Sequence, residues 1–225
     1  MSLEQLVDAA VQSRWREWFD AARETMRSRS AIPRSLVEVA AQHPLVDGLT
    51  PGPEFTARLT RGAEVYWARR NAGEDVEIYV PGSRHRVNDI HDQVSLSTAG
   101  IRFLRELGIQ HESLHGDDLN AQYKGRQGVY GSADECFVAT RYYFDGNFGR
   151  LFSVCSPSQM MRKTLHYIAF GVVPLNVTAP VDEPYHDYLH ELFEAVPHVL
   201  AIDSTLQEDD SAEARRLRRD RRPEA

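Results

Sequence analysis

Apolar positions recur along the chain with two different periods, and these periods predict helices and strands in turn. Helical spacing runs through the first 30 residues. Residues 76–80, Val-Glu-Ile-Tyr-Val, have the β-branched, alternating character of a strand. Between them we expect a short helix over residues 35–42 and a loop over residues 43–53, where prolines and glycines gather. The apolar stripe of the first helix consists of Leu6, Ala9, Val11, Trp15, Trp18, Phe19 and Ala22.

Helices and strands are predicted to alternate through the rest of the chain. The pattern indicates helices over residues 54–71, 95–107, 129–144, 156–170 and 185–194, and further strands over residues 150–155, 172–177 and 199–202. Strands that alternate with helices of this length are typical of βαβ units and a parallel sheet. We therefore predict an α/β fold: a Rossmann-like three-layer domain with a mostly parallel sheet, plus extra N-terminal helices.

One domain accounts for most of the 225 residues, because no repeat or low-complexity linker divides them. We expect residues 1–42 to be an N-terminal helical extension packed on an α/β domain of residues 43–205. Residues 206–225 are expected to be a charged, disordered tail, with six arginines between Arg215 and Arg222. Such a run could contact an acidic partner, but a solvated terminus is the more common explanation.

Composition excludes several classes of protein. A net charge of −7 argues against general nucleic-acid binding, which needs cations to neutralise phosphates. No run approaches the roughly 18 apolar residues of a membrane-spanning helix, and charged residues interrupt the N-terminal stretch, so we expect no membrane anchor and no secretory signal. Two cysteines cannot form a disulfide framework. A cytoplasmic protein is expected, with a homo-oligomer among the open alternatives.

The first candidate site segment is VPGSRHRVNDIHD, residues 80–92, which directly follows the best strand. Open α/β sheets bind ligands in the loops at the carboxyl ends of their strands. We predict that Gly82 and Ser83 bind the ligand and that His85 is catalytic.

Two further segments, GVYGSADEC and CSPSQMMRK, each begin a predicted helix. Ser132 with Glu135, and Ser156 with Gln159, have the spacing of capping boxes. Satisfying the free amides of the helix start is one explanation of these residues. The other is that amides and helix dipole bind an anion.

Arg162 and Lys163 would complete a phosphate or carboxylate site at the second of these helix starts, with Ser158 on the same helix face as Arg162. We predict that Glu135 is catalytic. The predicted ligand-binding residues at these helix starts and in the loop before them are Asn120, Ser132, Ser156, Ser158, Gln159, Arg162 and Lys163. The carboxyl ends of parallel strands lie at the same edge of the sheet. The loops of residues 81–92, 116–135 and 155–163 should therefore form one pocket there.

Metal and thiol chemistry are two further alternatives. His85, Asp89, His91 and Asp92 could gather a divalent ion, but their spacing matches no closed zinc pattern, and we predict no metal ligands. The GxxxxGK[ST] and GxGxxG fingerprints are absent, so the cofactor is left unknown. Cys155 precedes a helix start, a setting that lowers a thiol pKa, although packing of a buried small residue is the preferred interpretation.

Taken in order, these segments resemble the YdcF-like family, which includes the SanA and ElyC proteins, over roughly residues 55–180. The similar segments are RLTRGAEVYWARR, EIYVPGSRH, LSTAGIRFLRELGI, GSADEC and FSVCSPSQMMRK. Glu135 stands where the family often has Asn, and Gln159 where it often has His. The resemblance implies a Rossmann-like fold whose pocket takes a nucleotide-like or phosphorylated small ligand.

The preferred function is therefore an enzyme, a transferase or hydrolase, acting on a small anionic metabolite that is phosphorylated or nucleotide-like. Glu135 or His85 would be its general acid or base. A non-catalytic binding or sensor module would use the same pocket. An adaptor that binds through its N-terminal helices or arginine-rich tail is the third alternative.

Overall fold

The computed structural model describes residues 3–42, 44–84, 86–87, 90–117, 122–123, 126–129 and 131–180. Its centre is a five-stranded, all-parallel sheet in the order β5-β2-β1-β8-β9. These strands are β1 (Arg34–Val39), β2 (Asp75–Pro81), β5 (Leu114–Asp117), β8 (Arg150–Cys155) and β9 (Leu175–Thr178). The strands β3 (Arg86–Val87) and β4 (Ile90–His91) form one small antiparallel pair, and β6 (Gln122–Tyr123) and β7 (Arg126–Gln127) form another.

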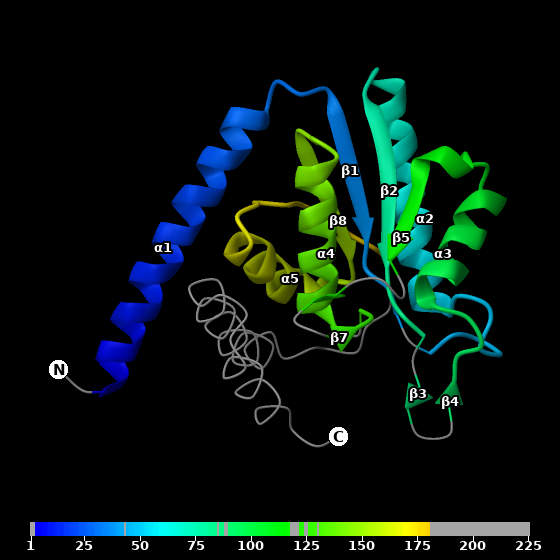
Figure 1. The fold of residues 1–225 in the computed structure, drawn as a ribbon, viewed down its shortest axis with the longest axis horizontal. Helices are drawn as coiled ribbons and strands as arrows, with labels where there is room; N and C mark the ends of the chain where they lie inside the picture. Colours follow the sequence, from blue (N-terminus) through cyan, green and yellow to red (C-terminus); the bar gives the residue numbers. More distant parts are fainter. Residues whose placement is uncertain are drawn as a thin grey trace.

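Helices cover both faces of the sheet, which gives the three layers seen in Figure 1. One face is covered by α2 (Pro53–Asn71) and α3 (Leu96–Glu106), and the other by α4 (Ser132–Asp145) and α5 (Pro157–Ala169). The long helix α1 (Leu3–Arg29) contacts α5, and a short 3-10 helix, η1 (His111–Ser113), precedes β5. The predicted α/β three-layer fold is confirmed.

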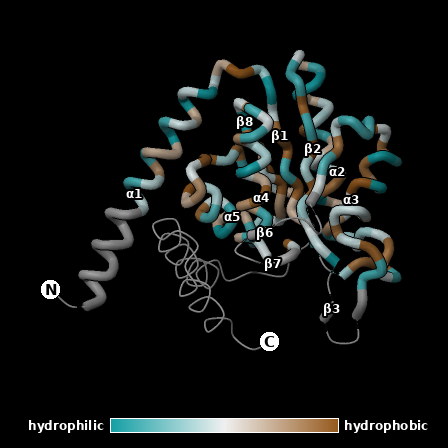
Figure 2. Tube along the Cα trace, in the orientation of Figure 1, coloured by the Kyte–Doolittle hydropathy of each residue, from teal (hydrophilic) through white to brown (hydrophobic). Residues whose placement is uncertain are grey.

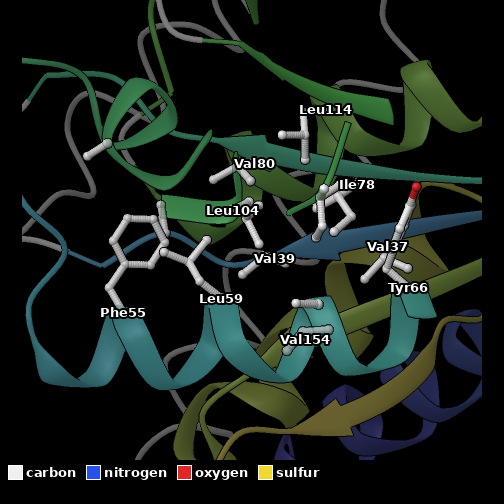
Figure 3. Packing of buried hydrophobic residues seen from close by; sticks show 14 of the residues in the cluster. Val37, Val39, Phe55, Leu59, Tyr66, Ile78, Val80, Leu104, Leu114 and Val154 are labelled. Carbon is white, nitrogen blue, oxygen red and sulfur yellow. The ribbon is translucent and has the colours of Figure 1, made fainter. Parts of the chain in front are cut away.

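Burial on both faces follows from the alternation of side chains along the strands. Val37 and Val39 of β1 join the core beneath α2 and α3, whereas Leu36 joins the core beneath α4 and α5. Figure 3 shows Phe55 and Leu59 of α2 pointing toward the strands of the first core. In Figure 2 hydrophobic residues gather at the centre of the molecule and hydrophilic ones on the outer helix turns.

The chain reverses its direction of winding at β1. It proceeds from β1 through α2 to β2 and through α3 to β5, and α4 then returns it to β8 on the other side of β1. In such a sheet the carboxyl ends of β1 and β8 form the topological switch point, where open α/β sheets bind ligands. The starts of α2, α3, α4 and α5 lie along this edge, which we call the carboxyl edge.

The helix predicted over residues 35–42 is wrong, because this segment contains β1, the central strand of the sheet. Arg34 to Glu38 pair with β2 on one side, and Ser35 to Val39 pair with β8 on the other. A strand with neighbours on both sides and helices on both faces has no solvent-facing positions. Its pattern of continuous burial therefore lacks the two-residue period that marks a half-exposed strand. Residues 34–42 consequently belong to the α/β domain, and only α1 extends it at the N-terminus.

Most other elements lie close to their predicted positions. The strand β5 is absent from the prediction, because Leu-His-Gly-Asp contains no β-branched residue and resembles a loop. The elements predicted over residues 185–194 and 199–202, and the predicted tail of residues 206–225, lie outside the described residues. Within the described part of the chain, no helix combines the length and apolar character needed to cross a membrane.

A polar cluster on the α4–α5 face of the sheet joins β5 to its neighbours. Glu77 of β2 accepts hydrogen bonds from the Tyr142 hydroxyl at 2.6 Å and from His115 Nε2 of β5 at 3.0 Å, and it pairs with Arg34. Burial alone raises the pKa of Glu77, but the bonds from His115, Tyr142 and Arg34 outweigh it and lower that pKa to about 2. The ionised carboxylate thus links β1, β2, β5 and α4.

We predict that Glu77 contributes stability above pH 4.5 that is lost as the pH falls toward 2. The sign follows from its lowered pKa: the unfolded chain takes up a proton near 4.5, whereas the folded chain resists protonation until about 2. Urea denaturation of Glu77→Gln between pH 6 and 2.5 should show a shallower acid loss than the wild type. Glu64→Gln, an exposed glutamate of α2, is the control, and equal acid slopes in both variants would contradict the prediction.

Close packing of α3 on β5 depends on the absence of a side chain at Gly116. A Cβ atom there would lie 2.7 Å from the carbonyl oxygen of Val80 and 1.9 Å from the Ser97 hydroxyl. We predict that Gly116→Ala lowers the free energy of unfolding by about 1–3 kcal/mol, as overpacking does. Gly131→Ala is the matched control, because Gly131 has an extended backbone and a Cβ atom there would meet no atom within 4 Å. Equal losses in the two variants, measured by urea denaturation, would show that the close contact does not matter.

Candidate functional site

The connection after β2 is held tightly against the end of β1. Gly82 has a φ of 151°, and a Cβ atom at this position would lie 2.9 Å from the Cβ atoms of Ala41 and Leu96. Glycine is therefore required by both conformation and space. Ser83 is buried, and its hydroxyl accepts a 2.7 Å hydrogen bond from the Val129 amide. This bond joins residues 81–92 to residues 116–135, which are two of the three predicted loop segments.

The predicted capping boxes are wrong at both helix starts. Ser132 is the first residue of α4 rather than its N-cap, which is Gly131, so no serine hydroxyl is in the capping position. Ser156 is the N-cap of α5 and Pro157 its first residue, as predicted, but the Ser156 side chain makes no cap hydrogen bond. Its hydroxyl has stronger partners elsewhere, because it donates to Glu54 at 2.6 Å and accepts from Arg58 Nε at 2.8 Å.

Arg58 is the centre of a buried cluster on the α2 side of the switch point. Besides Ser156, its guanidinium binds Glu54 and donates to the carbonyl oxygens of Ala40 at 3.4 Å and Ala41 at 3.1 Å. Arg58 is 0% exposed. Its planar group carries donors in several directions, which suits it to join the ends of β1 and β8 to the start of α2.

A second buried cluster lies on the opposite side of β1, around Lys163. Its ammonium donates to Glu38 Oε1 at 2.7 Å and to Glu135 Oε2 at 2.8 Å. Glu38 also accepts a 3.0 Å hydrogen bond from the Ser153 hydroxyl, and Glu135 accepts a 3.3 Å bond from the Ala41 amide. The side chains of Lys163 and Glu38 are 0% exposed, and that of Glu135 is 10% exposed.

Burial and charge act in opposite directions on these groups. Burial raises the pKa of Glu38 above its ordinary value, and Lys163 only partly offsets this effect. Burial alone would lower the pKa of Lys163, but the carboxylates of Glu135 and Glu38 raise it, so the amine is charged. A charged lysine of this kind is neither a nucleophile nor a base.

Burial also determines the chemistry of Cys155. It raises the pKa of this thiol to about 12, in spite of the adjacent helix start and Lys163. The preferred interpretation of Cys155 as a packing residue agrees with its 0% exposure. The same holds for Cys136, whose pKa burial raises strongly. Neither thiol is activated.

The predicted site residues fall into three groups. Gly82, Ser83, Ser156 and Lys163 are buried beneath the carboxyl edge, and their polar groups bond to the protein itself. Ser132 begins α4, and Ser158, Gln159 and Arg162 lie in the first two turns of α5, where Gln159 and Arg162 are half-buried. His85 and Asn120 lie outside the described residues. The contact between Glu135 and Lys163 joins two of the predicted segments, whereas a cleft shared by His85, Glu135 and Arg162 stays a prediction.

Sequence reasoning missed three of the residues at the centre of this edge: Glu38, Glu54 and Arg58. Glu38 resembles a polar position of a short helix as long as its strand is not recognised. Arg58 resembles an exposed position of α2. A signal was present for Glu38, since a lone carboxylate within Leu-Val-Glu-Val is unusual in a buried strand unless it has a partner.

No described group of three or more His, Cys, Asp or Glu side chains is arranged to hold a metal ion. His85 and Asp89 of the alternative metal site lie outside the described residues.

We predict that Arg58→Met lowers the free energy of unfolding by about 3–5 kcal/mol, because it leaves two carbonyls, a hydroxyl and a carboxylate without their common donor. Arg61→Met on the same helix is the control. Arg61 pairs with Glu64 at the surface, with 43% and 57% of the side chains exposed, and such pairs contribute about 1 kcal/mol or less. Urea denaturation of both variants decides the matter, and similar losses would contradict a special role for Arg58.

No family model matches the chain, and no curated protein matches it. The proposed function below therefore depends on the geometry of the carboxyl edge and on the resemblance carried by the short segments quoted above.

Proposed function

We propose that this protein binds a small anionic metabolite, phosphorylated or nucleotide-like, at the carboxyl edge and acts on it as an enzyme. The proposed position is above the switch point between β1 and β8. The observation that carries the proposal is the state of the helix starts along this edge. Of its four helices, only α3 has a side-chain cap, in which Ser95 accepts a 3.0 Å bond from the Thr98 amide.

The helices α2, α4 and α5 begin at the same edge without side-chain caps. The N-caps of α2 and α4 are glycines, and the serine at the N-cap of α5 is bonded to Glu54 and Arg58. Free amides and the positive end of the helix dipole attract anions. A phosphate or carboxylate would accept from backbone amides at these helix starts in place of side-chain caps.

Arg162 is the side chain that we propose for pairing with the anion. The cations Arg58 and Lys163 are 0% exposed, so they lie too deep to contact a ligand at the edge. Lys163 therefore fixes the position of Glu135 and does not contact the ligand. Arg162 is half-buried in the second turn of α5, one turn beyond Ser158 and Gln159. A guanidinium matches the geometry of phosphate and carboxylate groups.

Glu135 is the proposed general acid or base, and His85 is the second candidate for this role. Glu135 lies in the first turn of α4, and it is the member of the Lys163 cluster with measurable exposure. A carboxyl group fixed by a lysine and a backbone amide is held in one orientation, as acid–base catalysis requires. Turnover of a bound ligand separates this enzyme from the alternative, a non-catalytic sensor that uses the same site.

The ligand class can be tested by native mass spectrometry of the full-length protein as purified. We expect a copurified small anion that is displaced by excess inorganic phosphate or by a nucleoside phosphate. A protein that carries no small molecule, and that binds neither probe in calorimetry, would contradict the proposed function.

We predict that Arg162→Ala weakens binding of the displacing anion by about 1.5–3 kcal/mol, the usual contribution of a hydrogen bond to a charged group. Calorimetric titration with the same probe measures this change. Arg102→Ala removes an exposed arginine from α3 and should leave the affinity unchanged. Unchanged affinity in a folded Arg162→Ala variant would place the anion elsewhere.

A further inference from the structure

The cluster around Lys163 has an imbalance of charge. One ammonium contacts two carboxyl groups, those of Glu38 and Glu135, so the fully ionised cluster carries a net charge of −1. Arg58, which is also fully buried, is bonded to Glu54 on the opposite side of β1. An uncompensated charge in a protein interior is costly, and a buried carboxyl group takes up a proton instead.

Three further titratable groups that interact with Glu38, those of Tyr167, Cys136 and Cys155, do not restore the balance. Tyr167 of α5 is fully buried, and burial raises its pKa well above the ordinary value, so its hydroxyl is neutral. Burial likewise keeps the thiols of Cys136 on α4 and Cys155 on β8 in their neutral forms. Ser153, which pairs with Glu38 across the sheet, carries no charge. The cluster therefore needs one proton to become neutral.

We infer that the Glu38–Lys163–Glu135 cluster holds one dissociable proton at neutral pH, that the proton resides on Glu38, and that Glu135 is the group through which it exchanges with the carboxyl edge.

Hydrogen-bond geometry assigns the proton to Glu38. Glu135 Oε1 accepts from the Ala41 backbone amide, which can only donate, and its Oε2 accepts from Lys163. Both oxygens of Glu135 thus face hydrogen-bond donors, so neither has an acceptor for a proton. Glu38 Oε1 also faces Lys163, but its Oε2 faces the Ser153 hydroxyl at 3.0 Å. A hydroxyl can turn and accept, so a proton on Glu38 Oε2 has a partner in Ser153.

The route to the surface follows from exposure. Glu38 and Lys163 are 0% exposed, so a proton leaves the cluster through Glu135, whose side chain reaches solvent at the start of α4. To act as an acid, Glu135 must first receive the proton of Glu38; once it has passed this proton to a bound group, the cluster carries a net charge of −1 until it takes up a proton from solvent. This role as an acid rests on the proposed function, whereas the presence of the proton does not.

The proton can be detected directly by carbon-13 NMR of the glutamate carboxyl groups in the unliganded, full-length protein. We expect one glutamate resonance to keep the chemical shift of a protonated carboxyl at pH 7, and we expect this signal to be absent from Glu38→Gln. It should also be absent from Glu135→Gln, because Glu38 and Lys163 then balance each other and Glu38 ionises. Glu64→Gln, which removes an exposed glutamate of α2, should retain the signal.

Two results would overturn the inference. The first is a wild-type spectrum in which every glutamate is ionised at pH 7. The second is a protonated signal that survives in Glu135→Gln, since burial of Glu38 alone would then hold the proton. The assay contains no ligand, so its failure is separate from a failure of the proposed function.

Stability gives an independent measurement should either variant give a poor spectrum. A carboxyl whose pKa is higher in the folded than in the unfolded chain contributes stability below its unfolded pKa, and this contribution is lost as the pH rises toward the folded value. The difference in unfolding free energy between Glu38→Gln and wild type should therefore shift in favour of the variant as the pH rises above 4.5. A difference that is constant with pH would count against a proton on Glu38.

Discussion

Two buried cations hold the middle of the carboxyl edge together from opposite faces of β1. Arg58 on α2 binds the last carbonyls of β1 and the hydroxyl at the start of α5, and Lys163 on α5 binds carboxylates from β1 and α4. Each cation is stable in the interior only because its partners are in place. The mutual positions of β1, β8 and three helices are therefore fixed by charge pairing as well as by apolar contact.

The two faces of the sheet differ in how they are packed. Beneath α2 and α3 the core is made of aliphatic and aromatic side chains, and Gly116 lets α3 approach the sheet closely. Beneath α4 and α5 an apolar core is interrupted by Glu38 near the switch point and by Glu77 farther along the sheet. Polar groups inside a core restrict the arrangements that its neighbours can adopt. The α4–α5 face accordingly contains the Lys163 and Glu77 clusters, whereas the Arg58 cluster lies at the carboxyl edge on the α2 side.

Periodicity sufficed for the α/β architecture because most of its helices are amphipathic and because β2, β8 and β9 are recognisable as apolar runs between them. It failed at β1, where burial on all sides removes the alternation that identifies a strand. The site was predicted in part for a related reason. Ser132, Glu135 and Ser156 marked the right helix starts, yet the hydroxyl of Ser156 bonds to Glu54 and Arg58, which are about 100 positions away in the sequence. Local spacing contains no information about such partners.

The separation of these partners along the chain also orders the events of folding. Lys163 lies 125 positions after Glu38 in the sequence, and Ser153 lies 115 positions after it. In chain order β1, α2 and β2 all precede α5, which supplies the cation that pairs with Glu38 and part of the cover on that side of β1. Contacts between distant segments form slowly, because the chain between them must lose conformational entropy before the contacts can stabilise it. The Lys163 cluster can thus form only after α5 is present, and a chain interrupted before α5 lacks one of the two buried cations of the carboxyl edge.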